Sequence, residues 1–155
     1  MQLTAFRRSM RAAFAVAMLA LCAGAVGSIR AEGVAASLSC EFEGGTSSSY
    51  SGGTFSSRSP LPLRFGIVGI DLEQQQARLE TSTAGAASGT LRVIRALNAN
   101  HFLEVVPEGF LNLTTVYDLD PAAGAYPAVH SRHLGVLGQP VFAQYTGFCR
   151  ARATP

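Results

Sequence analysis

The stretch Leu38-Ser39-Cys40-Glu41-Phe42 sets the pattern that the rest of the chain repeats. The apolar residues Leu38, Cys40 and Phe42 alternate with polar neighbours. This period of two is typical of a half-buried β-strand whose two faces meet different surroundings. The stretch therefore predicts a strand that carries a cysteine on its buried face.

Similar alternating runs follow through the remaining sequence, between breaks rich in Gly, Pro, Ser, Asn and Asp. No segment of residues 31–155 keeps a helical period over eleven residues. The predicted strands cover residues 63–72, 77–80, 90–96, 101–106, 110–117, 128–134 and 141–149. We therefore expect an all-β fold: an antiparallel meander of about eight strands that forms a small barrel or a two-sheet sandwich.

Two irregular segments modify this pattern. At Ile67-Val68 the alternation slips by one residue between Gly66 and Gly69, which predicts a β-bulge. Residues 44–60 are rich in Gly and Ser, which is typical of a flexible surface loop. We favour a hairpin there, because Tyr50 and Phe55 bracket a pair of glycines that suits a tight turn. Residues 71–76 form either one helical turn or a hairpin loop.

The N-terminus has the three parts of a secretory signal peptide. Arg7, Arg8 and Arg11 precede an apolar run that passes into small residues. The run over residues 12–27 is shorter than the ~20 residues that span a bilayer, which favours cleavage over a membrane anchor. We predict a signal peptide over residues 1–27, a single β domain over residues 28–155, and a periplasmic or secreted protein. The cleavage site, after Ala25, Gly27 or Ala31, and the choice between general and twin-arginine export stay open.

Composition narrows the possible functions. The chain has 155 residues, of which 48% are hydrophobic and 14% charged, so it is long enough for one core and too apolar for disorder. It carries 12 basic and 10 acidic residues, and three of the basic ones belong to the predicted leader. The remaining balance is close to neutral, so we expect no nucleic-acid partner and no membrane span after cleavage.

Two cysteines remain beyond the leader, Cys40 in the first strand and Cys149 in the last. An even pair in an exported domain predicts a disulfide. Such a bridge would tie the first element to the last and, in a barrel, hold the edge strands together. A metal pair or a reactive thiol is the alternative, although the spacing lacks a CxxC motif.

The densest polar cluster is His130-Ser131-Arg132-His133. The simplest interpretation is that these side chains hydrogen-bond to Glu104, Asp118 or backbone carbonyls. As a binding site, the cluster would take an unidentified protein or a small polar or anionic ligand. The binding residues that we predict are His101, Glu104, His130, Arg132, His133 and Tyr145.

Enzymatic alternatives need a closer arrangement of the same histidines. A metal site or a small hydrolase would use His101, His130 and His133. Because residues three apart on a flat strand face opposite sides, His130 and His133 would converge only at a bulge or a turn. Ser131 lacks the GxSxG motif of a nucleophile elbow. We therefore predict no cofactor and no catalytic residue.

The sequence resembles a group of small exported bacterial proteins to which no function is assigned. The segments that carry the resemblance are residues 38–42, 101–104, 114–116, 128–133 and 144–149. In architecture alone the chain is similar to the periplasmic lysozyme-inhibitor barrels, which are compact, all-β and closed by a disulfide. We expect an exported, non-enzymatic binding module. The alternatives are an enzyme using the three histidines, a structural envelope protein, and a protein similar to the lysozyme inhibitors.

Overall fold

A computed structural model describes residues 35–81, 89–107, 109–136 and 139–152 of the chain. The predicted signal peptide and the possible cleavage sites lie outside these residues. So do residues 82–88, 108 and 137–138, which fall in the breaks between predicted strands. The strands belong to a compact unit, Val34–Pro155.

The described residues form nine strands and no helix, as the alternation predicts. The strands are β1 (Ser37–Ser51), β2 (Thr54–Arg58), β3 (Leu63–Asp71), β4 (Gln76–Thr81), β5 (Thr90–Arg95), β6 (Ala99–Val106), β7 (Phe110–Tyr117), β8 (Tyr126–Val136) and β9 (Gln139–Ala151). No helix among these residues is long and apolar enough to cross a membrane.

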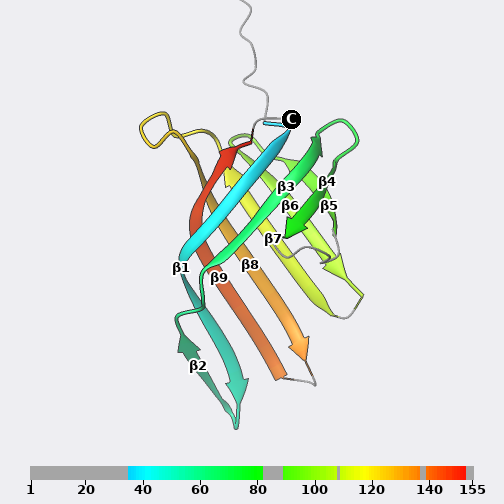
Figure 1. Ribbon diagram of the computed structural model, residues 1–155. Helices are drawn as coiled ribbons and strands as arrows, with labels where there is room; N and C mark the ends of the chain where they lie inside the picture. The colour runs from blue at the N-terminus through cyan, green and yellow to red at the C-terminus, as the bar shows by residue number, and fades with distance from the viewer. Residues whose placement is uncertain (1–34, 82–88, 108, 137–138, 153–155) are drawn as a thin grey trace, which may run out of the picture. The chain divides into compact units, whose positions relative to one another are not determined.

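Eight of the strands form a closed antiparallel barrel (Figure 1). Strands β3 to β9 follow one another around the barrel, and β1 pairs with β3 on one side and with β9 on the other. The pairing of β1 with β9 decides between the two architectures left open by the sequence, since a sandwich would leave these strands in separate sheets. The fold is a barrel with one additional strand, β2.

The core lies inside the barrel, on the alternating positions that point inward. Phe42 and Ile67 are fully buried, and their rings and methyl groups belong to one continuous apolar cluster with residues of the facing strands. Phe42 stacks on Phe65 with the ring centroids 5.5 Å apart. The alternation read from the sequence is thus the alternation between barrel interior and outer surface.

The predicted disulfide is confirmed. Cys40 and Cys149 lie directly opposite each other in the pairing of β1 with β9, with their Cα atoms 4.0 Å apart. Both cysteines are completely buried. The bridge therefore crosses the seam at which the first and the last strand close the barrel.

The two irregular segments, the bulge in β3 and the hairpin within residues 44–60, are present in the structure but differ in detail from the prediction. β3 has the expected bulge, but it lies at Gly69-Ile70 and not at Ile67-Val68: Ile67 and Val68 pair regularly with β4, the register shifts between Val68 and Asp71, and Gly69 takes a positive φ of 61°. The segment 44–60 contains the expected hairpin, in which Tyr50 pairs with Phe55 across Gly52-Gly53. The loop alternative does not hold for the first half of the segment, which belongs to β1, since that strand extends to Ser51.

The turn between β3 and β4 is a hairpin loop and not a helical turn. The side chain of Asp71 accepts hydrogen bonds from the backbone N–H groups of Glu73 (2.9 Å) and Gln74 (2.8 Å). Such a side-chain bond fixes a tight turn locally. The turn closes with Gln75 at a positive φ of 56°.

Candidate functional site

The candidate site lies on the inner wall formed by β6, β7, β8 and β9. In the cross-strand register, Glu104 lies opposite Asn112, and Asn112 lies opposite Arg132. One pair further along, Thr114 lies opposite His130, which lies opposite Tyr145. Side chains that are opposite one another share a face of the sheet. These polar residues therefore interrupt the apolar lining of the barrel.

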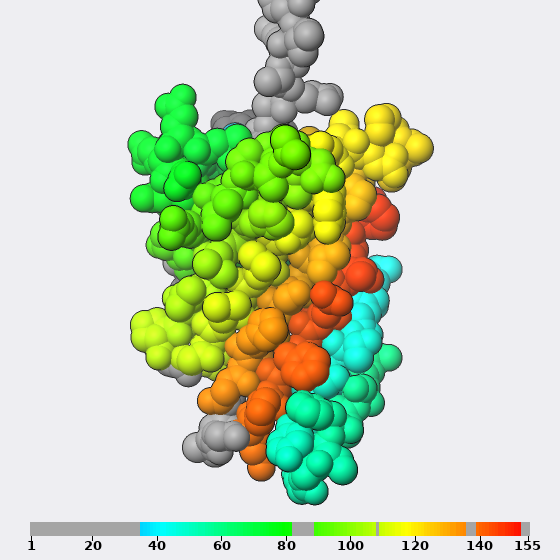
Figure 2. All heavy atoms as spheres, turned by 180° about the vertical axis from the view of Figure 1, so that it is seen from behind, coloured from blue at the N-terminus to red at the C-terminus, as the bar shows by residue number. Residues whose placement is uncertain are grey.

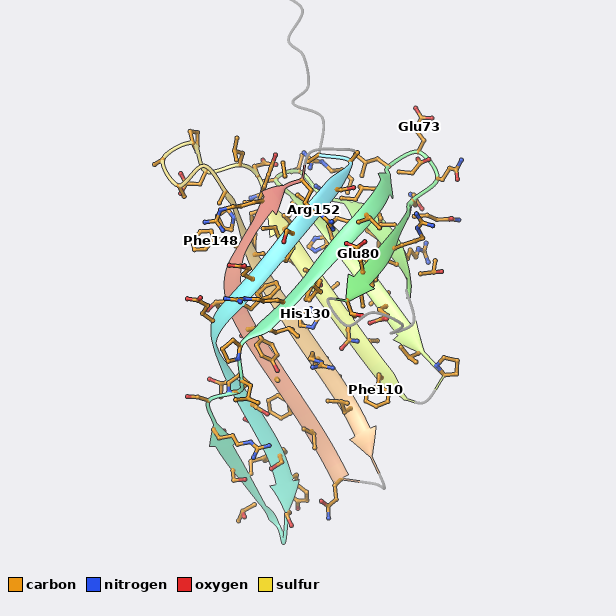
Figure 3. The ribbon with its side chains drawn as sticks, in the orientation of Figure 1. Glu73, Glu80, Phe110, His130, Phe148 and Arg152 are labelled. Carbon is orange, nitrogen blue, oxygen red and sulfur yellow. A yellow bond between two sulfur atoms is a disulfide. The ribbon has the colours of Figure 1, made fainter. Side chains whose placement is uncertain are left out.

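His130 is buried at the centre of this wall. Only 6% of its surface is exposed, and its Nδ1 lies 2.8 Å from Thr114 Oγ1 in a hydrogen bond. Its ring centroid lies 5.1 Å from that of Phe65 and 5.9 Å from that of Tyr145. Figure 3 shows His130 within the ring of strands, whereas Phe148 of β9 projects from the outer surface.

Burial keeps His130 uncharged. Desolvation and, to a smaller extent, the positive charge of Arg132 together lower the pKa of its imidazole from 6.5 to about 4. A neutral imidazole can form the bond with the Thr114 hydroxyl in either direction, depending on its tautomer. At neutral pH, His130 is therefore a neutral, packed member of the wall.

Glu104, Asn112 and Arg132 form a polar row beside His130. The Asn112 side chain donates a hydrogen bond from Nδ2 to Glu104 Oε2 at 2.7 Å, which orients the amide. Asn112 Oδ1 and Arg132 Nε are buried and have no hydrogen-bond partner within the described part of the chain. An uncompensated buried polar atom costs stability, and such groups are concentrated at functional sites.

Arg132 and Tyr145 also line a cavity of about 500 Å³. Leu63 of β3 and Ser47 of β1 contribute further barrel positions, and the β2–β3 connection over residues 59–62 supplies a largely apolar wall. Arg58, at the end of β2, brings a second guanidinium group to the same cavity. The lining residues thus combine two positive charges with Pro and Leu side chains and include no carboxylate.

Three of the other six arginines in the described ranges pair with carboxylates, whereas Arg78, Arg92 and Arg150 do not. Arg64 contacts Glu41 and Glu43, Arg95 contacts Asp118, and Arg152 contacts Glu80. Within the described ranges, neither Arg58 nor Arg132 lies within ion-pair distance of a carboxylate. The cavity therefore has a positive character that these residues leave uncompensated.

The predicted site residues divide into two groups. His130, Arg132, Tyr145 and Glu104 are brought together on the inner wall, as the register shows. His101 and His133 lie on the outer surface: His101 Nδ1 is 3.0 Å from Thr115 Oγ1, and His133 is exposed. The three histidines do not converge. In the described residues, no group of three or more His, Cys, Asp or Glu could hold a metal ion.

Thr114 and His130 form a hydroxyl–imidazole pair, which is a combination that nucleophilic catalysis uses. Here both residues are more than nine-tenths buried. Neither is among the residues that line the described cavities. We therefore interpret the pair as part of the packed interior, where each polar group satisfies the other.

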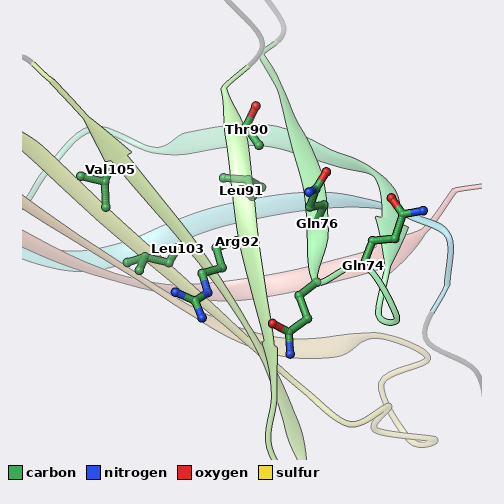
Figure 4. Close-up of a pocket in the computed structure, with 8 residues that line it drawn as sticks. Gln74, Gln76, Thr90, Leu91, Arg92, Leu103 and Val105 are labelled. Carbon is green, nitrogen blue, oxygen red and sulfur yellow. The ribbon is translucent and has the colours of Figure 1, made fainter.

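A second hollow of about 590 Å³ lies across β4, β5 and β6 (Figure 4). Its polar lining comes from Gln74, Gln75, Gln76 and Arg92, and all four side chains are exposed. Solvated side chains give up their water contacts when they bind a ligand. This hollow is therefore a weaker candidate than the cavity that contains Arg132.

Sequence reasoning missed two residues of the site, Asn112 and Arg58. Asn112 belongs to the site because it lies between Glu104 and Arg132 in the register, and the alternation of β7 places it on the face of Thr114. Arg58 reaches the cavity through the hairpin of β1 and β2. Comparisons of the chain with models of protein families, with curated proteins and with solved structures gave no match.

Proposed function

We propose that the protein is an exported, non-enzymatic binding module that holds a small anionic ligand in the cavity lined by Arg58, Arg132 and Tyr145. The observation that carries the proposal is that two arginines, Arg58 and Arg132, line one cavity whose lining includes no carboxylate. An arginine offers several N–H donors in a planar arrangement that matches a carboxylate or a phosphate.

The rest of the lining indicates the kind of anion. Residues 60–63 present Pro-Leu-Pro-Leu to the cavity, so part of the ligand would contact apolar side chains. Ligand sites generally combine an apolar wall with a few polar groups that fix orientation. A carboxylate with a short aliphatic tail satisfies both parts of the lining. The uncharged His130 lies outside the lining and packs against Tyr145.

The disulfide is compatible with an oxidising compartment, in agreement with the predicted signal peptide. Export thus remains part of the proposal. It is tested separately by the mass of the mature protein recovered from outside the cytoplasm.

The binding proposal is tested with hexanoate and its neutral isostere hexanamide, using isothermal titration calorimetry. We expect hexanoate to bind more tightly than hexanamide, because only the carboxylate pairs with the guanidinium groups. Arg132→Gln should weaken hexanoate binding by about tenfold or more, which corresponds to the loss of one charged hydrogen-bonding partner.

The matched control is Arg150→Gln, which removes an exposed arginine of β9 that lies outside this cavity. This variant should bind hexanoate like the parent protein. The proposal is wrong if neither hexanoate nor inorganic phosphate binds at millimolar concentration, or if Arg132→Gln and Arg150→Gln have equal effects.

A further inference from the structure

Strand β2 differs from every other strand in having one neighbour. It pairs with β1 from Ser47↔Arg58 to Ser51↔Thr54, and its opposite edge meets no strand of the described residues. The backbone N–H and C=O groups along such an edge are free to pair with another extended chain. In Figure 2 the hairpin of β1 and β2 forms a lower corner of the barrel, beside β9.

The edge lacks the features by which proteins usually prevent strand addition. Those features are prolines, bulges and charged side chains placed along the edge. The sequence of β2 is Thr-Phe-Ser-Ser-Arg, all five residues are exposed, and the register with β1 runs without a shift. Its one charged residue, Arg58, stands at the end of the strand. The edge is therefore open along its length.

An aromatic cluster lies on one face of this hairpin. Phe55, which is 62% exposed, packs against Tyr50 and Phe142, with ring centroids 4.9 Å and 6.1 Å away. On the same face, the next pair consists of the small residues Ser48 and Ser57, joined by a hydrogen bond of 2.7 Å between their hydroxyl oxygens. On this face of β2, the bulky Phe55 is therefore followed by the small Ser57.

We propose that β2 pairs antiparallel with β2 of a second copy of the chain, with Ser56 opposite Ser56 at a two-fold axis. This register uses all five residues of the strand. It places Phe55 opposite Ser57 of the second copy, so that each large ring lies against a small side chain. It also places Arg58 opposite Thr54, so that no like charges oppose each other.

A second copy of β2 is favoured over an unrelated strand because the large and small residues of β2 match one another when two copies pair antiparallel. In a two-fold interface, both copies contribute the same surface, so that surface must be complementary to itself. β2 meets this condition because Phe55 and Ser57 lie on either side of Ser56, so the large side chain of one copy lies opposite the small side chain of the other. Five residue pairs bury far less than the ~800 Å² per partner of a stable interface, so the dimer is expected to be weak.

The test uses the compact unit Val34–Pro155, which contains every described strand. Sedimentation of this protein should show the mean mass rising from monomer towards dimer between about 10 µM and about 1 mM, the range expected for a small interface. Ser56→Lys and Ser56→Glu should each stay monomeric, because they place like charges directly opposite each other. Mixed in equal amounts, the two variants should associate again.

Ser51→Lys is the control, since Ser51 is an exposed residue of the same hairpin that lies on β1 and not on the free edge. It should dimerise like the parent protein. Circular dichroism checks that both variants at Ser56 keep the fold. A parent protein that is monomeric at 1 mM, a Ser56→Lys variant that dimerises normally, or a mixture that stays monomeric would each overturn the proposal.

Discussion

His130 shows how one residue can look functional in the sequence and act structurally in the fold. It is the most buried of the three histidines, and its ring packs among Phe42, Phe65 and Tyr145. Its hydrogen bond to Thr114 satisfies one ring nitrogen inside the barrel. Because the ring is enclosed and neutral, we interpret His130 as a packing residue that lies against Tyr145, a residue of the proposed binding cavity.

The buried imidazole predicts a pH dependence of stability. The pKa of His130 is about 4 in the folded protein and 6.5 as the reference value, so the unfolded chain binds a proton more readily. The stability associated with this group is fully present above pH 6.5 and is lost progressively as the pH falls to about 4. Its loss amounts to about 3 kcal/mol, to be measured by urea unfolding between pH 4 and pH 8.

His130→Asn isolates this effect, since the variant cannot take up the proton. The quantity compared is the change of unfolding free energy with pH, because the smaller side chain also lowers stability at every pH. His133→Asn is the control: His133 is exposed, so its replacement should leave the pH dependence unchanged. An unchanged slope in His130→Asn would contradict the assignment.

At the scale of elements, the contact between β1 and β9 depends on a glycine. The register of the two strands shifts between Phe42 and Gly44, which leaves Glu43 as the extra residue of a bulge. Gly147 of β9 lies at this shift, where a Cβ atom would collide with the carbonyl oxygen of Glu41 and lie 2.7 Å from Phe42 Cα. Backbone atoms cannot move aside as a flexible side chain can.

Gly147→Ala is therefore expected to destabilise the barrel by about 1–3 kcal/mol, the usual cost of overpacking, measured by urea unfolding. Gly135→Ala provides the comparison, since no atom lies within 4 Å of a Cβ built at Gly135 of β8. The Gly135 variant should unfold at nearly the parent urea concentration. Equal losses in the two variants would show that the close approach of β1 and β9 does not limit stability.

The strands β1, β3 and β9 show which parts of the fold could be predicted from the sequence. Alternation in residues 38–42 and the slip near Gly69 are local signals. The structure confirms the strand, and it has the bulge slightly later than predicted, at Gly69-Ile70. The pairing of β1 with β9 is not local, because it joins segments more than a hundred residues apart. The choice between barrel and sandwich therefore had to come from the structure.

The candidate site was predictable to the extent that it depends on alternation along one strand. His130 and Arg132 are two apart and share the inner face, whereas His133 is three from His130 and faces outward. The contact between Glu104 and Asn112 depends on the register between strands, which composition does not encode. Arg58 was missed for the same reason, since its pairing with Ser47 across the hairpin of β1 and β2 brings it to the cavity.

At the scale of the whole molecule, the disulfide, the core and the candidate site all involve the pairing of β1 with β9 that closes the barrel. The strands β1 and β9 meet through Cys40 and Cys149, and the cavity containing Arg132 is lined by residues of β1, β2, β3, β8 and β9. Opening the seam between β1 and β9 would separate Ser47 from Tyr145 and expose Phe42. We therefore predict that the proposed binding cavity depends on the closure of the barrel.

The double variant Cys40→Ala, Cys149→Ala tests this coupling. The bridge joins residues 109 positions apart, and a cross-link of that length stabilises a fold by up to about 4–5 kcal/mol by restricting the unfolded chain. Urea unfolding should show a loss of this order, and reductant should lower the stability of the parent protein while leaving the variant unchanged.

If the bridge acts only on the unfolded chain, the folded variant should still bind hexanoate with parental affinity. If it also holds the seam closed, hexanoate binding and the hydrogen-exchange protection of β1 and β9 should weaken together, which separates the two roles of the disulfide.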